Sequence, residues 1–356
     1  MGSNIMRTLA FYLPQFYPNP QNDEWWGAGF TEWTNVARAR PQFRGHYQPH
    51  IPADLGFYDL RLAETREAQA ELAKKYGVTG FCYYHYWFHG TRMLERVLDE
   101  VLASGTPDLP FSICWANESW TKTWIGGEKD ILLHQTYSDE DDREHIRYLI
   151  NFFRDPRYIR VNGRPLFVIY NTASLEERLP QMLDIWNEEL AKAGIPELYL
   201  CSVRNAPPAG FEAGINFFPN FDLIPFTGVD RLKYGYLRKV SSAFKHTIVD
   251  YPKLVDSMIG APEPEYRMYH CPVPSWDNTA RRAEQGGLIL DGSTPDEFER
   301  WARFAVEDTR DKFAGEEQLL FVNAWNEWAE GTHLEPDQRW GHAYLKALKN
   351  ALNSGR

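Results

Sequence analysis

Short apolar runs alternate with longer amphipathic stretches along nearly the whole chain. Runs of this length, rich in Val, Ile, Tyr and Phe, are typical of buried β-strands. The predicted strands cover residues 9–16, 79–86, 111–116, 166–170, 198–203, 215–219, 268–273 and 319–324. Helical periodicity marks residues 60–75, 93–104, 140–153, 179–193 and 295–313.

Eight strands interleaved with helices predict an α/β fold, a single (β/α)8 TIM-type barrel with long βα loops. A doubly wound sheet is the alternative, but no Gly-x-Gly-x-x-Gly follows the first strand. We expect one catalytic domain over residues 6–350. Two long irregular segments, 17–55 and 204–230, interrupt the alternation, and long loops inside a domain usually carry function. In a barrel, the active site lies at the carboxyl ends of the strands.

Aromatic residues make up 15 % of the 356 residues, with 13 Trp, 19 Tyr and 21 Phe. This exceeds the needs of a core and predicts a cleft that binds its ligand with ring faces. The net charge of −11 and the lack of a Lys/Arg-rich run argue against nucleic acid as a partner. No apolar run approaches the 18 or so residues that a transmembrane helix needs, so we expect no membrane span.

The N-terminus has no signal-peptide pattern, so we expect a cytoplasmic protein as encoded, or a periplasmic one if a leader has been removed. The oligomeric state stays open. The four cysteines form no Cys-x-x-Cys pair and sit in apolar runs, which predicts buried, reduced thiols. His85 and His89 have no further ligands at suitable spacing, and no phosphate-binding loop occurs. We therefore expect neither a metal nor another cofactor.

Two carboxylates three residues apart follow the last predicted strand. Glu327 and Glu330 lie in the segment Asn-Glu-Trp-Ala-Glu-Gly. On a helical turn, positions i and i+3 share a face, so both acids are expected to point into the barrel mouth. Two close carboxylates separate their pKa values and provide one acid and one base, as glycoside hydrolysis requires. The structural alternative is a solvated first turn of a helix.

A further carboxylate, Glu118, follows the third predicted strand in the segment Trp-Ala-Asn-Glu. Glu118 and Glu327 form a rival acid and nucleophile pair, and a capping role for Glu118 in a loop is equally open. We expect the neighbouring Trp115 to stack on a sugar and the amide of Asn117 to hold a sugar hydroxyl.

Aromatic and histidine side chains also follow the second and seventh predicted strands. Strand alternation sends His85 and Trp87 to one side and Tyr86 to the other. All three are candidates for sugar binding, and packing beneath the helices is the alternative for about half of such rings. Trp276 and Asp277 repeat the pairing of a ring with a carboxylate, where Asp277 either binds a sugar hydroxyl or caps the next helix.

Six motifs, at residues 10–16, 22–27, 29–36, 80–87, 115–118 and 325–331, resemble the WbsX-like family. That family is related to glycoside hydrolase family 99, the endo-α-mannosidases and endo-α-mannanases, and the resemblance spans most of the chain. From these motifs we expect the remaining substrate contacts to be Tyr12, Gln15, Trp33, Trp325 and Asn326.

The resemblance implies a (β/α)8 barrel, retention of anomeric configuration and no metal. It also implies that Glu327 deprotonates the substrate 2-hydroxyl, which attacks C1 to give a 1,2-anhydro sugar. Glu330 would then be the general acid and, in the second step, the base for water. No enzyme carboxylate attacks carbon in this scheme, so the usual separation rule for retaining enzymes does not apply to it.

The sequence thus favours a retaining α-glycoside hydrolase that acts on mannose- or rhamnose-like units of a bacterial polysaccharide or oligosaccharide. WbsX-like proteins have been labelled glycosyltransferases because of their association with O-antigen and capsule loci, but no sugar-nucleotide site is visible here. A transferase in O-antigen or capsule biosynthesis and a carbohydrate-binding barrel without activity are the alternatives. Sugar identity, linkage and endo or exo action stay open.

Overall fold

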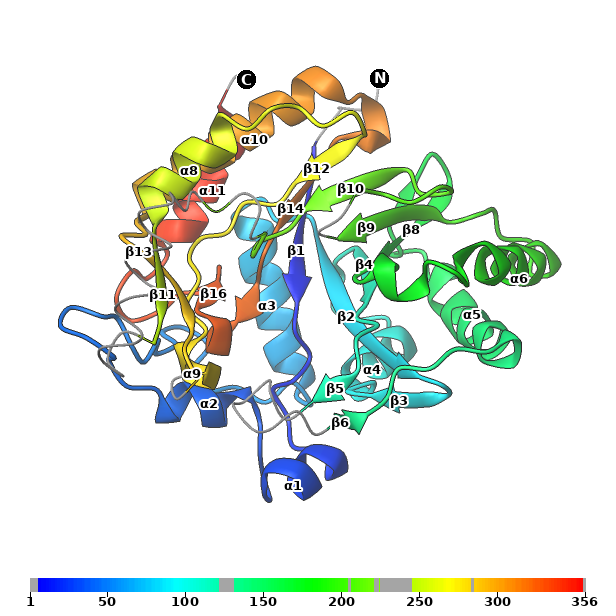
Figure 1. Cartoon of the computed structure of the whole chain (residues 1–356), viewed down its shortest axis with the longest axis horizontal. Helices are drawn as coiled ribbons and strands as arrows, with labels where there is room; N and C mark the ends of the chain where they lie inside the picture. The colour runs from blue at the N-terminus through cyan, green and yellow to red at the C-terminus, as the bar shows by residue number, and fades with distance from the viewer. Residues whose placement is uncertain are drawn as a thin grey trace.

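The computed structural model shows a mixed α/β architecture built around a parallel sheet (Figure 1). It describes residues 6–121, 131–203, 206–220, 224, 245–282 and 285–354. The irregular segment predicted at 204–230 therefore lies partly outside the described residues.

Eight parallel strands form a nearly closed barrel, as predicted. They are β1 (Arg7–Tyr12), β2 (Gly80–Phe88), β4 (Phe111–Trp115), β8 (Arg164–Ile169), β9 (Tyr199–Val203), β10 (Ala213–Asn216), β12 (Met268–His270) and β14 (Leu319–Val322). Their order in the sheet is β12-β10-β9-β8-β4-β2-β1-β14. Beyond the ends of β12 and β14, the amide of Asn323 donates to the carbonyl of Pro272 at 3.3 Å, which brings the two edges together.

Each predicted strand coincides with one barrel strand, with ends shifted by a few residues. In a barrel, both faces of a parallel strand are covered, so the strand is a continuous apolar run in the sequence. β2 shows this most clearly, because all nine of its residues are buried. The same burial explains why these short runs could be recognised without alternation of polar and apolar residues.

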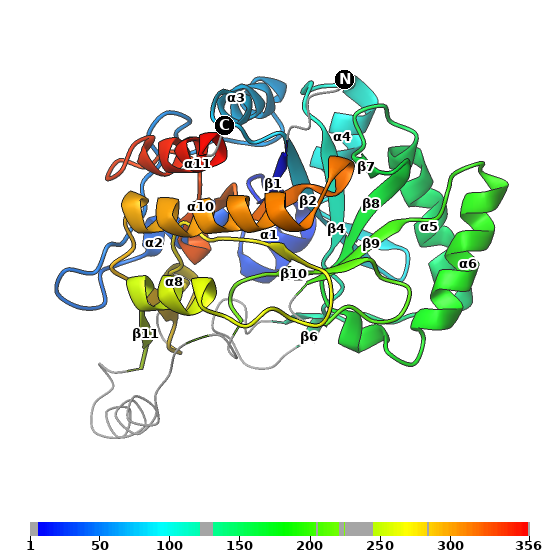
Figure 2. The same ribbon diagram turned by 90° about the horizontal axis from the view of Figure 1, so that it is seen from above.

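The predicted helices correspond to α3 (Ala63–Lys75), α4 (Arg96–Ser104), α5 (Asp139–Phe153), α6 (Leu179–Lys192) and α10 (Pro295–Lys312). Local capping sets where α5 and α10 begin. The Ser138 side chain accepts from the Asp141 amide, and Thr294 does the same for Glu297. Two further helices, α8 (Tyr251–Ile259) and α11 (Ala343–Asn353), were not predicted, and both lie beside α10 on the outside of the barrel (Figure 2).

The first long loop, 17–55, contains two short helices, α1 (Pro20–Trp26) and α2 (Glu32–Arg38). The prediction of an irregular segment is wrong over these two helices. Their sequences carry no apolar periodicity, and caps define them instead: Asn19 caps α1, and Thr31 forms a capping box on α2. The remaining short elements are β3 (Thr91–Met93), β5 (Trp120–Thr121), β6 (Ile131–Leu133), β7 (Arg160–Val161), β11 (Thr247–Asp250), α9 (Thr279–Arg282), β13 (Leu288–Asp291), β15 (Asn326–Glu327) and β16 (Thr332–His333).

The main apolar cluster fills the barrel and the layer between its strands and helices. A smaller cluster joins α8, β11 and β13 to Trp276 and Trp301. All four cysteines are buried and unbridged, as predicted. Within the described residues, no helix has both the length and the apolar character to cross a membrane. The single catalytic domain over 6–350 stays a prediction.

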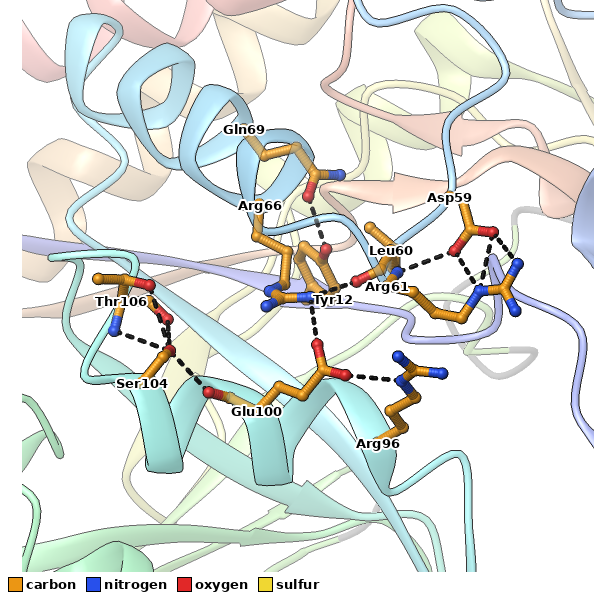
Figure 3. Close-up of polar contacts among 10 residues, drawn as sticks. All are labelled: Tyr12, Asp59, Leu60, Arg61, Arg66, Gln69, Arg96, Glu100, Ser104 and Thr106. Carbon is orange, nitrogen blue, oxygen red and sulfur yellow. Dashed lines mark hydrogen bonds and ion pairs between the residues drawn. The ribbon is translucent and has the colours of Figure 1, made fainter.

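A buried arginine joins α3 to α4 next to β1 (Figure 3). Arg66 of α3 has a side chain that is 4 % exposed, and it donates to the Glu100 carboxylate at 2.8 Å and to the Leu60 carbonyl. One turn further along α3, Gln69 accepts a hydrogen bond from the Tyr12 hydroxyl at 2.6 Å. These contacts fix α3 to the strand that begins the barrel.

We expect Arg66→Met to lower the free energy of unfolding by about 1–3 kcal/mol, because it leaves the buried Leu60 carbonyl without its donor. Glu100→Gln is the matched control and should cost less than about 1 kcal/mol, since the Glu100 side chain is 31 % exposed. Urea unfolding of both variants measures this. Equal losses in the two variants would contradict the role of Arg66.

Candidate active site

A cavity of about 450 Å³ opens at the carboxyl ends of the barrel strands. Its walls come mainly from the segments that follow β1, β4, β8, β10, β12 and β14, together with the last part of β2. The side chains that line it include Leu13, Gln15, Trp26, Phe30, Glu32, Tyr84, Tyr86, Glu118, Trp120, Tyr170, Phe217, Trp276, Asn278, Arg281, Arg282, Glu327 and Glu330. The predicted location of the site at this end of the barrel thus coincides with a cavity.

One guanidinium, that of Arg281, contacts three carboxylates at the wall of this cavity. Arg281 Nη1 lies 2.7 Å from Glu330 Oε1, Nη2 lies 3.1 Å from Glu327 Oε2, and Nε lies 3.0 Å from Glu32 Oε2. The Arg281 side chain is only 7 % exposed, and that of Glu32 only 3 %. The cluster is therefore a largely buried set of one cation and three acids.

The three acids reach Arg281 from two distant parts of the chain. Glu32 begins α2 in the first long loop, and Arg281 lies on α9 after β12. Glu327 ends the short strand β15, and Glu330 closes the single 3₁₀ turn that follows it, η5 (Trp328–Glu330). The expectation of a helical turn is thus corrected to a strand followed by a 3₁₀ turn, although both acids still meet one partner. Figure 1 shows α2, α9 and β16 in the same region of the molecule.

The backbone after Glu330 is held against the segment that carries Arg281. The Asp277 amide donates to the Glu330 carbonyl at 2.7 Å. Gly331 adopts φ +61°, and a Cβ at this position would lie 2.9 Å from the Asp277 nitrogen. Only glycine fits this turn without displacing Asp277, so the turn fixes Glu330 relative to Arg281.

The side chain of Asp277 resolves the two roles that the sequence left open for it. Its carboxylate accepts from the Thr279 amide at 2.9 Å at the start of α9, and it lies 2.7 Å from both His46 Nε2 and Gln48 Nε2. Burial raises its pKa, but the contacts with His46 and Thr279 outweigh burial and lower the pKa. Asp277 caps α9, anchors the first long loop and lies outside the cavity lining.

Six of the predicted site residues line the cavity: Gln15, Tyr86, Glu118, Trp276, Glu327 and Glu330. The other predicted residues lie outside the lining. His85, Trp87 and Trp115, predicted as sugar-binding residues, do not line the cavity. These rings face α5, where His85 Nε2 lies 3.0 Å from His145 Nε2 and the Trp115 ring centroid lies 4.6 Å from that of His145.

The side chains of β2 alternate between two sides as predicted, but the sequence did not show which side faces the cavity. Tyr84 and Tyr86 face the cavity, whereas the Trp87 indole donates to Asp141 of α5 at 2.8 Å. His85 pairs with His145 of α5, with 3.0 Å between the two Nε2 atoms.

Four further candidates lie behind the cavity wall and hold the framework. The Tyr12 hydroxyl donates to Gln69, and the Trp33 indole donates to the Tyr58 carbonyl at 2.7 Å. The Trp325 ring centroid lies 5.1 Å from that of Phe81. Asn326 is bonded through its amide to both backbone groups of Leu13, at 2.7 and 3.0 Å, which fixes the end of β1 beside Glu327.

Asn117 lines a second, smaller cavity of about 370 Å³ together with Glu118, Ser119, Gln135, Tyr137, Asn171 and Ser174. Its amide donates to the Asn171 carbonyl at 2.8 Å. Glu118 is common to both cavities, and its Oε1 accepts from the Asn171 amide at 3.2 Å. Asn117 therefore positions the loop next to Glu118 and does not face the main cavity.

Sequence reasoning missed Glu32 and Arg281 as site residues. Glu32 lies inside a motif that carries the family resemblance, and its position in a Trp- and Gly-rich loop was the one available signal. Arg281 had no local signal, because its partners are 46 to 249 residues away. Tyr84 and Tyr170 were likewise missed, although strand alternation places Tyr84 on the same face as Tyr86.

Burial has the largest single effect on the pKa of Glu327 and on that of Arg281. Burial raises the pKa of Glu327, Arg281 opposes this, and the charges of Glu330 and Glu32 raise the pKa further. Burial also lowers the pKa of Arg281, but the three carboxylates outweigh it, so the guanidinium stays charged. Burial and the two neighbouring acids thus raise the pKa of Glu327 and favour its protonated form.

The fold is similar to those of solved glycoside hydrolases. A glycoside hydrolase-like protein aligns with a TM-score of 0.64 and 15 % identity, over 99 % of this chain and 95 % of the other. The GH99 endo-α-mannosidase of Bacteroides thetaiotaomicron aligns with a TM-score of 0.57 and 16 % identity, over 97 % and 96 % of the two chains. At such identities, the likeness establishes the barrel fold.

Sequence comparison connects the chain to a family. The protein WxcX from two strains of Xanthomonas campestris pv. campestris, described as uncharacterized, is 40 % identical over 349 residues, which are 97 % of this chain and 49 % of WxcX. The chain thus spans about half the length of these relatives. The family described as Glycosyltransferase WbsX matches residues 8–348. The chain therefore belongs to the WbsX family.

Proposed function

We propose that the protein is a retaining α-glycoside hydrolase that acts on mannose- or rhamnose-like units of a bacterial polysaccharide or oligosaccharide. The observation that carries this proposal is the pair Glu327 and Glu330, joined through Arg281 at the mouth of a barrel cavity. The family resemblance and the barrel shared with glycoside hydrolases support it.

The cavity offers the groups that bind a sugar ring. Tyr84, Tyr86 and Trp276 provide aromatic faces and edges for C–H groups, and the amides of Gln15 and Asn278 provide donors and acceptors for hydroxyl groups. A volume of about 450 Å³ lies within the range of small-ligand pockets. These features favour a carbohydrate over an apolar ligand.

In the proposed reaction, Glu327 removes the proton of the substrate 2-hydroxyl, whose oxygen attacks C1. Glu330 gives a proton to the departing glycosidic oxygen, so the products are a 1,2-anhydro sugar and a free alcohol. In the second step, Glu330 takes a proton from water, the water oxygen opens the anhydro ring at C1, and Glu327 returns its proton to the 2-oxygen. Two inversions at C1 give net retention.

This cycle requires one proton on the pair, which agrees with the charge balance around Arg281. In the substrate-free protein, burial keeps that proton on Glu327. The reactive state needs it on Glu330, so we infer that the proton changes carboxylate when the substrate binds. Arg281 contacts both acids and stabilises whichever one is the anion. Glu32 balances the charge of Arg281 from the other side.

Glycosyl transfer is the second candidate, and the family description favours it. The same pair serves a transferase if an acceptor hydroxyl replaces water in the second step. A nucleotide-sugar donor would need groups for its phosphates, and Arg282 is a basic residue of the cavity wall that makes no ion pair within the described part of the chain.

We expect Glu327→Gln and Glu330→Gln each to lower turnover of α-linked manno- or rhamno-oligosaccharides by about 10³-fold or more. With an α-glycosyl fluoride, whose leaving group needs no proton, Glu330→Gln should recover turnover and Glu327→Gln should not. NMR of the first-formed anomer should show retention. Glu118→Gln is the matched control from the same cavity and should lose less than about 100-fold. A Glu118→Gln variant as inactive as Glu330→Gln would favour the rival pair.

Glu327→Gln should also change how stability depends on pH. The pKa of Glu327 is higher in the folded protein than in the unfolded chain, where it is about 4.3. The stability that the raised pKa provides is fully present below the unfolded-state pKa and is lost as the pH rises through the folded-state pKa. From pH 5 to pH 9, the free energy of unfolding of Glu327→Gln should therefore rise relative to that of the wild type by at least about 1.4 kcal/mol, the equivalent of one pKa unit. Urea unfolding of both proteins at both pH values checks this, and a stability difference between variant and wild type that is the same at pH 5 and pH 9 would contradict it.

Titration of the protein with nucleoside diphosphates by calorimetry separates the two candidate functions. A hydrolase should show no saturable binding up to millimolar concentration. Binding with a Kd below about 1 mM that weakens in Arg282→Gln would favour the nucleotide-sugar transferase and count against hydrolysis.

A further inference from the structure

A second cluster of titratable side chains lies outside the cavity described above. His50, His333 and Asp337 are all buried, and their potential ligand atoms lie within 4.8 Å of one another. His50 Nδ1 is 2.9 Å from His333 Nε2, and Asp337 Oδ2 is 4.0 Å from the same nitrogen. None of the three lines the cavity or contributes to the proposed acid–base pair.

The hydrogen bond at the far side of His333 sets which of its nitrogens can bind a metal. Nδ1 lies 2.9 Å from the carbonyl oxygen of Glu335. A carbonyl oxygen only accepts, so Nδ1 carries the hydrogen and Nε2 presents its lone pair to His50 and Asp337. Metal-binding histidines are oriented in this way by a carbonyl or carboxylate on the second nitrogen.

The surrounding side chains hold all three groups in place. Trp328 stacks on His333 with ring centroids 3.8 Å apart and planes at 16°, and Tyr47 stacks on His50 at 4.3 Å and 25°. The Trp340 amide donates to Asp337 Oδ1 at 2.6 Å, which leaves Oδ2 toward the histidines. The Tyr47 hydroxyl donates to that Oδ2 at 3.0 Å.

The three side chains also match the chemistry of a metal site, because each offers one ligand atom to the same point. Neutral imidazole and carboxylate are the ligands that Zn²⁺ takes in proteins.

The geometry points to a site for one divalent transition-metal ion, with Zn²⁺ the best match, bound by His50 Nδ1, His333 Nε2 and Asp337 Oδ2. Tetrahedral bonds of about 2.0–2.2 Å place ligand atoms about 3.3 Å apart. The separations of 2.9 and 4.0 Å lie on either side of that value, and all three ligand atoms lie within 4.8 Å of one another, so shifts of about 1–1.5 Å complete the site. Binding requires that the mobile proton of His50 sit on Nε2. A water molecule or the Tyr47 oxygen fills the fourth position.

The ion would have a structural role and joins two segments that are 283 residues apart. His50 belongs to the first long loop, which also supplies Glu32. His333 belongs to β16, which pairs with β15, the strand that carries Glu327. This proposal differs from the sequence-based expectation that the protein binds no metal. It does not depend on the proposed reaction.

The test uses full-length protein without a histidine tag, stripped with a chelator and dialysed. We expect it to bind one equivalent of Zn²⁺ by calorimetry, to gain melting temperature on zinc addition, and to bind Co²⁺ with the visible absorption of a tetrahedral centre. His333→Gln and Asp337→Asn should each weaken zinc binding at least tenfold. His270→Gln is the matched control, because His270 forms a single pair with Asp308 at 2.7 Å, and it should bind zinc as the wild type does.

Two results would overturn the site. One is the absence of stoichiometric zinc binding to the wild type, which would mean that the cluster is a hydrogen-bonded contact only. The other is binding that persists unchanged in both His333→Gln and Asp337→Asn, which would mean adventitious zinc. If His333→Gln does not fold, His50→Gln replaces it, with circular dichroism to check folding before the titration.

Discussion

The ion cluster of Arg281 is the interaction on which the candidate site depends. A guanidinium that is 7 % exposed cannot remain in the protein without anions, and three carboxylates satisfy it. Because the acids outnumber the cation, the charges of Glu330 and Glu32 add to the effect of burial and raise the pKa of Glu327, which favours its protonated form. The acid–base role proposed for this site therefore depends on one buried cation and its three carboxylate partners.

The barrel and its long loops serve to keep that cluster assembled. Asn326 bonds to the backbone of Leu13 at the end of β1, and the Asp277 amide bonds to the Glu330 carbonyl. Asp277 in turn holds His46 and Gln48, so the first long loop is tied to the segment that carries Arg281. The strands provide a rigid base, while polar contacts between loops determine where each acid points.

The sequence allowed the eight strands to be predicted, and for the same physical reason it led to Glu327 and Glu330 as candidates, whose catalytic role stays a prediction. Strands buried on both faces are apolar runs, and in a barrel the chemistry follows the ends of those runs. His85 and Trp87 were misassigned because a strand covered on both sides gives no polar face to orient its alternation. Glu32, Arg281 and the His50–His333 contact could not be found, because each depends on side chains that only the fold brings together.

The position of Glu32 links loop placement to acid–base chemistry. If the first long loop moved away, Arg281 would lose one of its three anions and would interact more strongly with Glu327 and Glu330. Both carboxylates would then ionise more easily, and the pair would lose the single proton that the proposed cycle requires. The loop therefore does more than line the cavity, since the charge of Glu32 also raises the pKa of Glu327. The barrel fold by itself does not determine the charge balance around Arg281. The charged residues that follow the strand ends determine it.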